Sequence, residues 1–251
     1  MVAKRIIPCL DVKAGRTVKG VHFQELQAVG DPVELGHYSA ESGADELVYL
    51  DISASREERS TFTALVERIA QRINIPFTVG GGISSVDHAA RLLDSGADKI
   101  SVNTAAVANP ELIDAIASKY GSQFVVVAID ARCVDGVWRI PTHGGSRFTD
   151  KELFAWAREA QERGAGEILF TSMDHDGTKR GYPCDTFARM ASELSIPIIA
   201  SGGAGSVADI AEVLSVGRAD AALAASIFHY GEISVAELKR QLAEQSINVR
   251  I

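Results

Sequence analysis

Short hydrophobic runs alternate along the chain with longer segments that have helical periodicity. The runs are rich in β-branched residues and largely apolar throughout, which is typical of strands buried on both faces of a parallel sheet. A strand followed by a helix, repeated many times, is the pattern of βα units. We count eight runs, at Arg5–Leu10, Glu46–Asp51, Phe77–Gly80, Lys99–Val102, Phe124–Asp130, Glu167–Thr171, Ile198–Ser201 and Ala221–Ala225.

The segments between the runs have one apolar and one polar face, as expected of helices that cover a sheet. Examples are Phe62–Ile73, Val86–Leu93, Pro110–Ser118, Lys151–Arg163 and Val235–Leu242. Residues that favour helix N-termini stand at the starts of four of these segments, namely Ser85, Asn109, Asp150 and Ser234. Eight strand and helix pairs in 251 residues match the size of a closed (β/α)8 TIM barrel, so we predict that fold within the α/β class.

An internal repeat strengthens the barrel prediction. Residues 76–104 align with residues 197–226, so that Gly82 corresponds to Gly203. Unrelated βα units would not repeat such details. We therefore expect the two halves of the chain to be copies of one four-unit module, related by an approximate twofold axis.

The repeat also sets the expected domain organisation. We predict a single barrel domain over residues 1–251, with half-barrels at about 1–120 and 121–251. Two separate domains or a doubly wound open sheet are less favoured, because no Pro/Gly/Ser-rich linker divides the halves.

The composition argues against nucleic acid as the ligand. Hydrophobic residues make up 46% of the chain and charged residues 23%, and 25 Lys and Arg stand against 33 Asp and Glu, for a formal net charge of −8. Such a protein repels phosphate backbones. No apolar run is long enough to span a membrane and the first residues do not resemble a signal peptide, so we expect a cytoplasmic protein with no membrane partner.

The cysteines and histidines do not predict a metal site. The three cysteines, Cys9, Cys133 and Cys184, have neither CxxC nor Cys/His metal spacing, and the histidines show no HxH or HExxH pattern. We expect free thiols in a reducing compartment, no metal and no other cofactor.

Two aspartates are the first candidates for chemistry. Asp11 and Asp130 each end an apolar strand, and the repeat gives them equivalent places across the barrel mouth. Functional groups of such barrels lie at the carboxyl ends of the strands, and two separate carboxylates in one cavity can perform acid and base steps. The alternative is that each aspartate only caps a loop. Asp51 and Asp176 reach the same rim as auxiliary groups.

Two glycine-rich turns are the second candidates. Gly80–Gly82 and Gly202–Gly203 each precede a helix start, where backbone N–H groups can close on an anion. Asn103, Thr104 and Ser226 end the neighbouring strands and can complete the two cradles. A single turn of this kind is more often only a tight turn, but two equivalent turns predict a ligand with a phosphate at each end. We expect alanine at Gly82 or Gly203 to impair this ligand site more than folding.

Four charged residues lie at the opposite end of the predicted barrel. Arg5, Glu46, Lys99 and Glu167 stand at the starts of their strands, where they can form a closed ring. From residue types alone, a charge-paired plug is favoured over a role in transport or docking.

The segment after the first strand is polar. Lys13–His22, with Arg16 and Lys19, is predicted to be a long loop that either folds over an anionic ligand or is simply mobile.

At this point the chain resembles, over nearly its whole length, the cyclase subunit family of imidazole glycerol phosphate synthase. The segments that carry the resemblance are Ala3–Lys13, Gly30–Pro32, Phe77–Ile83, Ser101–Ala106, Val127–Ala131, Gly164–Leu169, Asp176–Lys179 and Ile199–Gly203. The resemblance implies ammonia-dependent conversion of phosphoribulosyl formimino aminoimidazole carboxamide ribonucleotide to imidazole glycerol phosphate and aminoimidazole carboxamide ribonucleotide, in histidine biosynthesis.

The resemblance also assigns residues. It places the two essential aspartates at Asp11 and Asp130. The bisphosphorylated small-molecule substrate is expected at Lys19, Gly82, Asn103, Thr104, Asp176, Gly177, Gly203 and Ser226. Which aspartate is acid and which is base stays open.

The family takes its ammonia from a separate glutaminase subunit, in a heterodimer, through the barrel. The resemblance therefore changes the interpretation of Arg5, Glu46, Lys99 and Glu167 from a plug to an ammonia gate. It also places Asp98 and Gln123 at the glutaminase contact. The chain departs from the usual family pattern at Asp150, which replaces a glycine, and at a one-residue insertion near Arg218.

Two other functions remain as alternatives. The sister isomerase of the same pathway is another half-barrel repeat that acts on a similar bisphosphate but needs no ammonia. A non-catalytic subunit that only activates a glutaminase would not need both Asp11 and Asp130.

Overall fold

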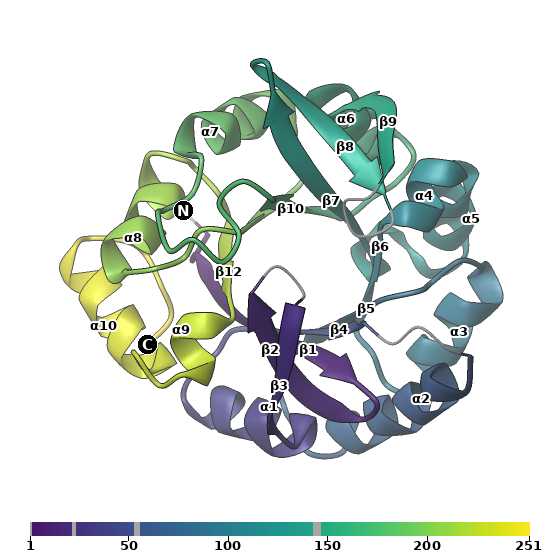
Figure 1. The fold of residues 1–251 in the computed structure, drawn as a ribbon, viewed down its shortest axis with the longest axis horizontal. Coiled ribbons are helices and arrows are strands. Elements are labelled where there is room, and N and C mark those ends of the chain that lie inside the picture. The colour runs from purple at the N-terminus through teal and green to yellow at the C-terminus, as the bar shows by residue number, and fades with distance from the viewer. Residues whose placement is uncertain (1, 22–23, 53–55, 143–146) are drawn as a thin grey trace.

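The computed structural model describes residues 2–21, 24–52, 56–142 and 147–251. Within these ranges, eight parallel strands form a ring in which β12 pairs with β1 and β10 pairs with β7. The sheet is therefore closed, as the view into the ring in Figure 1 shows, and the predicted TIM barrel is confirmed. The strands are β1 (Arg5–Lys13), β4 (Leu47–Asp51), β5 (Phe77–Gly80), β6 (Lys99–Val102), β7 (Val125–Val134), β10 (Glu167–Ser172), β11 (Ile198–Ser201) and β12 (Ala221–Ala224).

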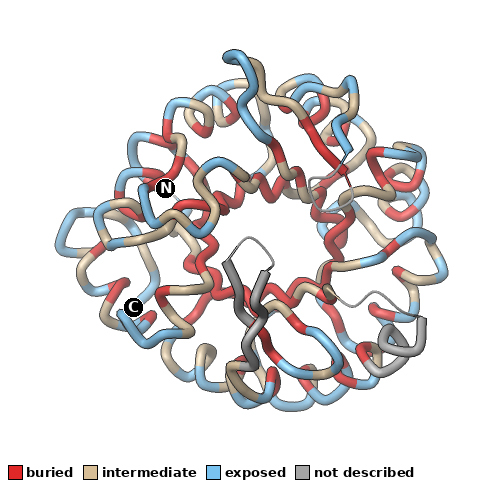
Figure 2. The backbone as a smooth tube through the Cα atoms, in the orientation of Figure 1, coloured by how far each residue is buried: buried red, intermediate tan, exposed pale blue. Residues whose placement is uncertain are grey.

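Helices surround the ring and turn their buried faces toward it (Figure 2). They are α1 (Pro32–Glu41), α2 (Arg56–Ala70), α3 (Val86–Asp94), α4 (Thr104–Ala108), α5 (Glu111–Tyr120), α6 (Leu153–Glu162), α7 (Cys184–Glu193), α8 (Val207–Ser215), α9 (Ser226–His229) and α10 (Val235–Glu244), with a 3-10 turn η1 (Ser122–Phe124). The main hydrophobic core fills the layer between strands and helices. In the described part of the chain no helix combines the length and hydropathy needed to cross a bilayer.

The predicted helix caps are confirmed at two of four positions. The Ser85 and Ser234 hydroxyls accept hydrogen bonds from the first turns of α3 and α10. Asn109 and Asp150 are not caps. Helix α5 begins after Pro110, and Asp150 lies in strand β9 (Arg147–Glu152), whose pairing with β8 keeps the backbone extended up to the start of α6.

The predicted loop at Lys13–His22 is wrong over its described part. Strand β1 continues to Lys13, reverses at Ala14 and Gly15, and pairs with β2 (Arg16–Val21), which pairs with β3 (Gln24–Gly30). Thr17 and Val18 are both buried, although the segment reads as polar. Lys19 lies on β2, and His22 is outside the described residues.

A second antiparallel ribbon extends β7 beyond the predicted strand end. Strand β7 turns at Asp135 and Gly136, both with positive φ, and pairs with β8 (Val137–Thr142), which pairs with β9. Asp-Gly is a strong signal for a two-residue hairpin. The ribbon carries the wall of the barrel mouth outward from Asp130.

The end of the barrel opposite the mouth is built from a motif that recurs in each quarter. In each quarter, a residue one or two positions before a barrel strand donates its N–H to a carbonyl at or near the start of the preceding barrel strand. In three quarters the donating residue is an aspartate. Its carboxylate also accepts a hydrogen bond from the N–H of the residue that supplies the carbonyl. These pairs are Asp45 with Ile6 (2.8 Å), Asp98 with Phe77 (3.0 Å) and Asp220 with Ile198 (3.0 Å).

The fourth quarter has Gly166 at the equivalent position. Its N–H donates to the Val125 carbonyl at 2.9 Å. A Cβ there would lie 2.1 Å from the Ser122 carbonyl oxygen, so η1 occupies the space that an aspartate side chain needs.

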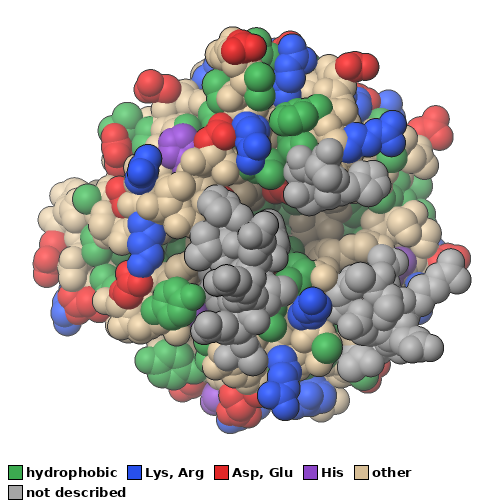
Figure 3. Space-filling model, in the orientation of Figure 1, with side chains coloured by type: hydrophobic (Ala, Val, Ile, Leu, Met, Phe, Trp, Pro, Cys, Tyr) green, Lys and Arg blue, Asp and Glu red, His purple; other side chains and the backbone are tan. Residues whose placement is uncertain are grey.

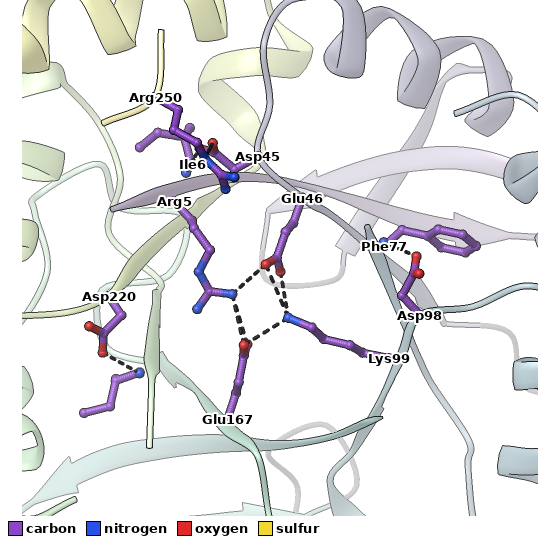
Figure 4. Close-up of polar contacts among 11 residues, drawn as sticks. Arg5, Ile6, Asp45, Glu46, Phe77, Asp98, Lys99, Glu167, Asp220 and Arg250 are labelled. Carbon is purple, nitrogen blue, oxygen red and sulfur yellow. Dashed lines mark hydrogen bonds and ion pairs between the residues drawn. The ribbon is translucent and has the colours of Figure 1, made fainter. Parts of the chain in front are cut away.

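Asp45 also fastens the last helix to the barrel. The Lys239 ammonium of α10 lies 2.8 Å from Asp45 Oδ2, and both side chains are almost fully buried, at 4% and 3% exposure. Arg250 Nε lies 3.1 Å from the other carboxylate oxygen (Figure 4). A buried ion pair that keeps all its partners is tolerated, but one left half-paired is costly.

We predict that Lys239→Met lowers the free energy of unfolding by about 3 kcal/mol, because Asp45 loses its buried partner. Urea denaturation checks this. The matched control is Arg158→Met, which removes the half-exposed ion pair with Glu193 and should cost less than about 1 kcal/mol. Equal losses in the two variants would contradict the prediction.

Candidate active site

A cavity of about 860 Å³ opens at the carboxyl ends of the barrel strands. The face of the molecule in Figure 3 is hollowed beside the centre of the ring. Asp11 on β1 and Asp130 on β7 both line the cavity, on opposite sides of the closed sheet. Other predicted site residues that line it are Gly82, Asn103, Thr104 and Asp176. Asp51, expected as an auxiliary group, lines it too and is 7% exposed.

Asp130 is held by its neighbours on the adjoining strands. The Asn103 Nδ2 group donates to Asp130 Oδ2 at 2.8 Å, and Thr171 lies opposite on β10. Burial raises the pKa of Asp130, and the nearby charge of Asp176 raises it further, against the opposing hydrogen bonds from Asn103 and Thr171. The carboxyl group therefore keeps its proton to a higher pH than an ordinary aspartate.

The turn after β5 forms the first cradle, which we define as Gly81, Gly82, Asn103 and Thr104. Gly81 and Gly82 have φ values of 106° and 61°, which favour glycine. A Cβ at Gly81 would lie 2.1 Å from the Asp51 carbonyl oxygen. The turn thus approaches the neighbouring strand closely, and it lines the same cavity as Thr104, the first residue of α4.

The residues of the second cradle, Gly177, Gly203 and Ser226, do not line the cavity themselves. Their chain neighbours Asp176 and Ala225 do. The loop after β10 is joined to the turn after β11 by a hydrogen bond from Gly181 N to the Gly203 carbonyl, 2.9 Å long.

This contact corrects the expected effect of alanine at Gly203. A Cβ at Gly203, which has a φ of 125°, would lie 2.1 Å from the Gly181 carbonyl oxygen. The glycine is therefore needed for packing between two loops, so alanine acts on folding first.

At the opposite end of the barrel the four predicted ring residues meet (Figure 4). Arg5 Nη1 lies 2.7 Å from Glu46 and 3.0 Å from Glu167, and Lys99 Nζ lies 3.1 Å and 2.9 Å from the same two carboxylates. Burial alone would lower the pKa of Arg5, but the charges of Glu167 and Glu46 raise it overall. The side chains are 10–16% exposed, so the ring closes this end of the barrel with paired charges.

Apolar side chains fill the barrel between the ring and the cavity. They form a separate hydrophobic cluster, made of Ile7, Cys9, Val48, Val126, Leu169, Ile199, Ala221 and Leu223. Cys9, Leu169 and Leu223 also line the cavity, so they form its floor.

Some residues differ from their expected places or were not foreseen. The Asp98 carboxylate is bonded to the Phe77 N–H, and the Gln123 side chain donates to the Tyr120 carbonyl, near the ring end. Arg132 lines the cavity and was missed, because the strand was expected to end at Asp130. The Asp-Gly hairpin signal after it was the available clue. Within the described residues, no group of His, Cys, Asp and Glu is arranged to hold a metal ion.

Comparisons with known proteins give the same kind of protein along the chain. Residues 5–234 match the family described as histidine biosynthesis protein. Imidazole glycerol phosphate synthase subunit HisF of Bacteroides thetaiotaomicron is 59% identical over 250 residues. The proteins of the same name from Phocaeicola vulgatus and Flavobacterium psychrophilum are 58% and 55% identical over 251 residues. Each alignment covers 100% of both chains.

The raised pKa of Asp130 predicts a gain in stability for Asp130→Asn. Since the folded chain binds this proton more tightly than the unfolded chain, the stability associated with Asp130 is complete below its ordinary pKa and decreases as pH rises through the folded value. Asparagine cannot ionise, so at pH 7 the melting temperature should rise by a few degrees. Calorimetry over a pH series tests this: the gain should shrink toward about pH 4, near the ordinary aspartate pKa. A gain independent of pH would contradict the prediction.

Proposed function

Because the chain belongs to the histidine biosynthesis protein family and to the cyclase subunits within it, we propose that Asp11 and Asp130 carry the acid and base steps of the cyclase reaction. The observation that supports this most directly is their shared cavity at the carboxyl ends of β1 and β7. In barrel enzymes the chemistry is performed at that end of the strands.

The surroundings of the two carboxyl groups support a division of labour. Ammonia must lose a proton after it attacks a carbon, and a departing amine must gain one. Asp130, whose pKa is raised by burial, begins as the acid, and Asp11 on the opposite wall begins as the base. The roles exchange as the adduct is cleaved and cyclised. Asn103 positions Asp130 by its 2.8 Å hydrogen bond.

The substrate is a small molecule, and the two cradles fit one with a phosphate at each end. The first cradle binds one phosphate through backbone N–H groups at Gly82, Asn103 and Thr104, beside Asp130. The second phosphate lies at Gly177, Gly203 and Ser226, and Asp176 faces the reacting part of the substrate. Lys19, which belongs to β2, is assigned to the substrate as well.

The chain acts as one subunit of a synthase complex, and we assign ammonia supply to a glutaminase subunit in a heterodimer. The glutaminase docks at the ring end, where Asp98 and Gln123 lie. The ring of Arg5, Glu46, Lys99 and Glu167 is the gate. The apolar cluster above it suits neutral ammonia better than ammonium, because a charged group in an apolar layer is costly.

We further infer that the chain is a single catalytic domain made of two half-barrels, about 1–120 and 121–251, that works in the cytoplasm. The four equivalent N–H to carbonyl contacts at the ring end support the repeat. The sister isomerase is disfavoured because the relatives named above are HisF subunits along their whole length. A purely activating role is disfavoured because both carboxyl groups face the cavity.

The purified chain should convert the formimino bisphosphate to imidazole glycerol phosphate with an ammonium salt at alkaline pH, without glutaminase. Asp11→Asn and Asp130→Asn should each lower kcat by at least about a thousandfold, because each removes one proton-transfer step. Mass analysis of products checks this, and Asp185→Asn on the exposed surface of α7 is the matched control. Turnover of the isomerase substrate without ammonia would refute the assignment.

Lys99→Met should uncouple the two subunits. It leaves Glu46 and Glu167 paired with Arg5 alone, so ammonia delivered from glutamine should leak. We expect product formed per glutamine hydrolysed to fall severalfold, while activity with added ammonium changes by less than about threefold. Arg189→Met, on an exposed ion pair of α7, is the control. Unchanged coupling in Lys99→Met would exclude the gate.

A further inference from the structure

The cavity at the barrel mouth contains more carboxylates than cations. Among the lining residues that the structure describes, Asp11, Asp51, Asp130 and Asp176 are acidic and Arg132 is basic. Phosphate groups are repelled by carboxylates and form their strongest hydrogen bonds with guanidinium. Within this part of the lining, Arg132 is therefore the cation that can attract a phosphorylated ligand.

Arg132 faces the cavity because of its place on β7. It follows Asp130 by two residues, and Ala131 between them is buried in the core against the helices. Alternate residues of a strand point to the same face about 7 Å apart. The Arg132 side chain thus lies one step further out on the wall than the carboxyl group that Asn103 of the first cradle contacts.

The partner of Arg132 can be exchanged for a ligand. Arg132 Nε lies 3.3 Å from Asp174 Oδ1, and the two side chains are 46% and 32% exposed, so their ion pair stabilises little. Asp174 Oδ2 accepts a 2.7 Å hydrogen bond from the Cys133 N–H. Asp174 therefore stays in place when the guanidinium turns to another anion.

A second arginine increases the positive potential. Arg139 on β8 is the register partner of Arg132, and directly opposed residues of an antiparallel pair share one face. Like charges so opposed repel each other. Asp174 forms an ion pair with Arg132, and Glu152 on β9 is the register partner of Arg139, so Glu152 offsets only part of the charge that Arg139 adds beside Arg132. An anion at Arg132 relieves the repulsion.

We propose that Arg132, supported by Arg139, binds the substrate phosphate that occupies the first cradle. The cradle contributes neutral N–H groups, and the guanidinium adds charge-assisted hydrogen bonds that compensate the surrounding carboxylates. Arg132 touches the phosphate and not the reacting atoms, so it governs affinity and leaves the rate of the chemical step alone. This inference rests on the proposed function, which supplies the bisphosphate.

The test compares Arg132→Met and Arg132→Lys with the unaltered chain. For Arg132→Met, the KM for the formimino bisphosphate and the dissociation constant of inorganic phosphate should each rise about 10- to 100-fold, with kcat within about threefold. Arg132→Lys keeps the charge but not the planar guanidinium. Its KM and its phosphate dissociation constant should lie between those of the unaltered chain and those of Arg132→Met. Arg91→Met, an exposed arginine on α3 outside the cavity, should change neither constant by more than about twofold.

Asp174→Asn is the second variant. Its amide oxygen still accepts from Cys133 but no longer neutralises Arg132, so inorganic phosphate should bind about two- to fivefold more tightly. If the unaltered chain turns over substrate and Arg132→Met binds inorganic phosphate with unchanged affinity, the inference is overturned and the cyclase assignment is left intact. Weaker phosphate binding in Arg132→Met without turnover in the unaltered chain would reject the proposed function and retain the anion site.

Discussion

Closure of the parallel sheet between β7 and β10 is the constraint on which the other features depend. In a closed parallel ring every strand is paired on both sides, and alternate residues must point into a narrow interior. All strand starts lie at one end of that interior and all strand ends at the other. Paired charges therefore collect at one end and the two aspartates at the other, although each group comes from distant parts of the chain.

The polarity of the barrel interior changes along the barrel axis, from paired charges through apolar side chains to carboxyl groups. Four interlocked charges at the strand starts satisfy one another, so the polar end costs little in unpaired groups. Next come apolar side chains, which keep the middle free of competing hydrogen-bond partners. Asp130 lies above them, where burial raises the pKa of its carboxyl group. The antiparallel ribbon that continues β7 then carries Arg132 onto the outer wall.

The sequence predicted correctly the features that depend on residue type within a short segment. Apolar runs predicted all eight barrel strands to within a few residues, because strands buried on both faces tolerate little else. It also brought Asp11 and Asp130 to a common cavity through the repeat. It failed where pairing partners decide the outcome. Arg16–Val21 reads as a polar loop until its hydrogen bonds to β1 and β3 are known, and the packing of Gly203 against Gly181 has no local signature.

Gly166 is the position at which one quarter of the ring end differs from the other three. Three quarters of the barrel keep an aspartate at the equivalent position, whereas here the Ser122 carbonyl oxygen stands 2.1 Å from where a Cβ would be. An aspartate at this position no longer fits, because the η1 backbone occupies the space of its side chain. Restoring the acid in a single mutational step would collide with backbone, and a viable reversal must first remodel η1.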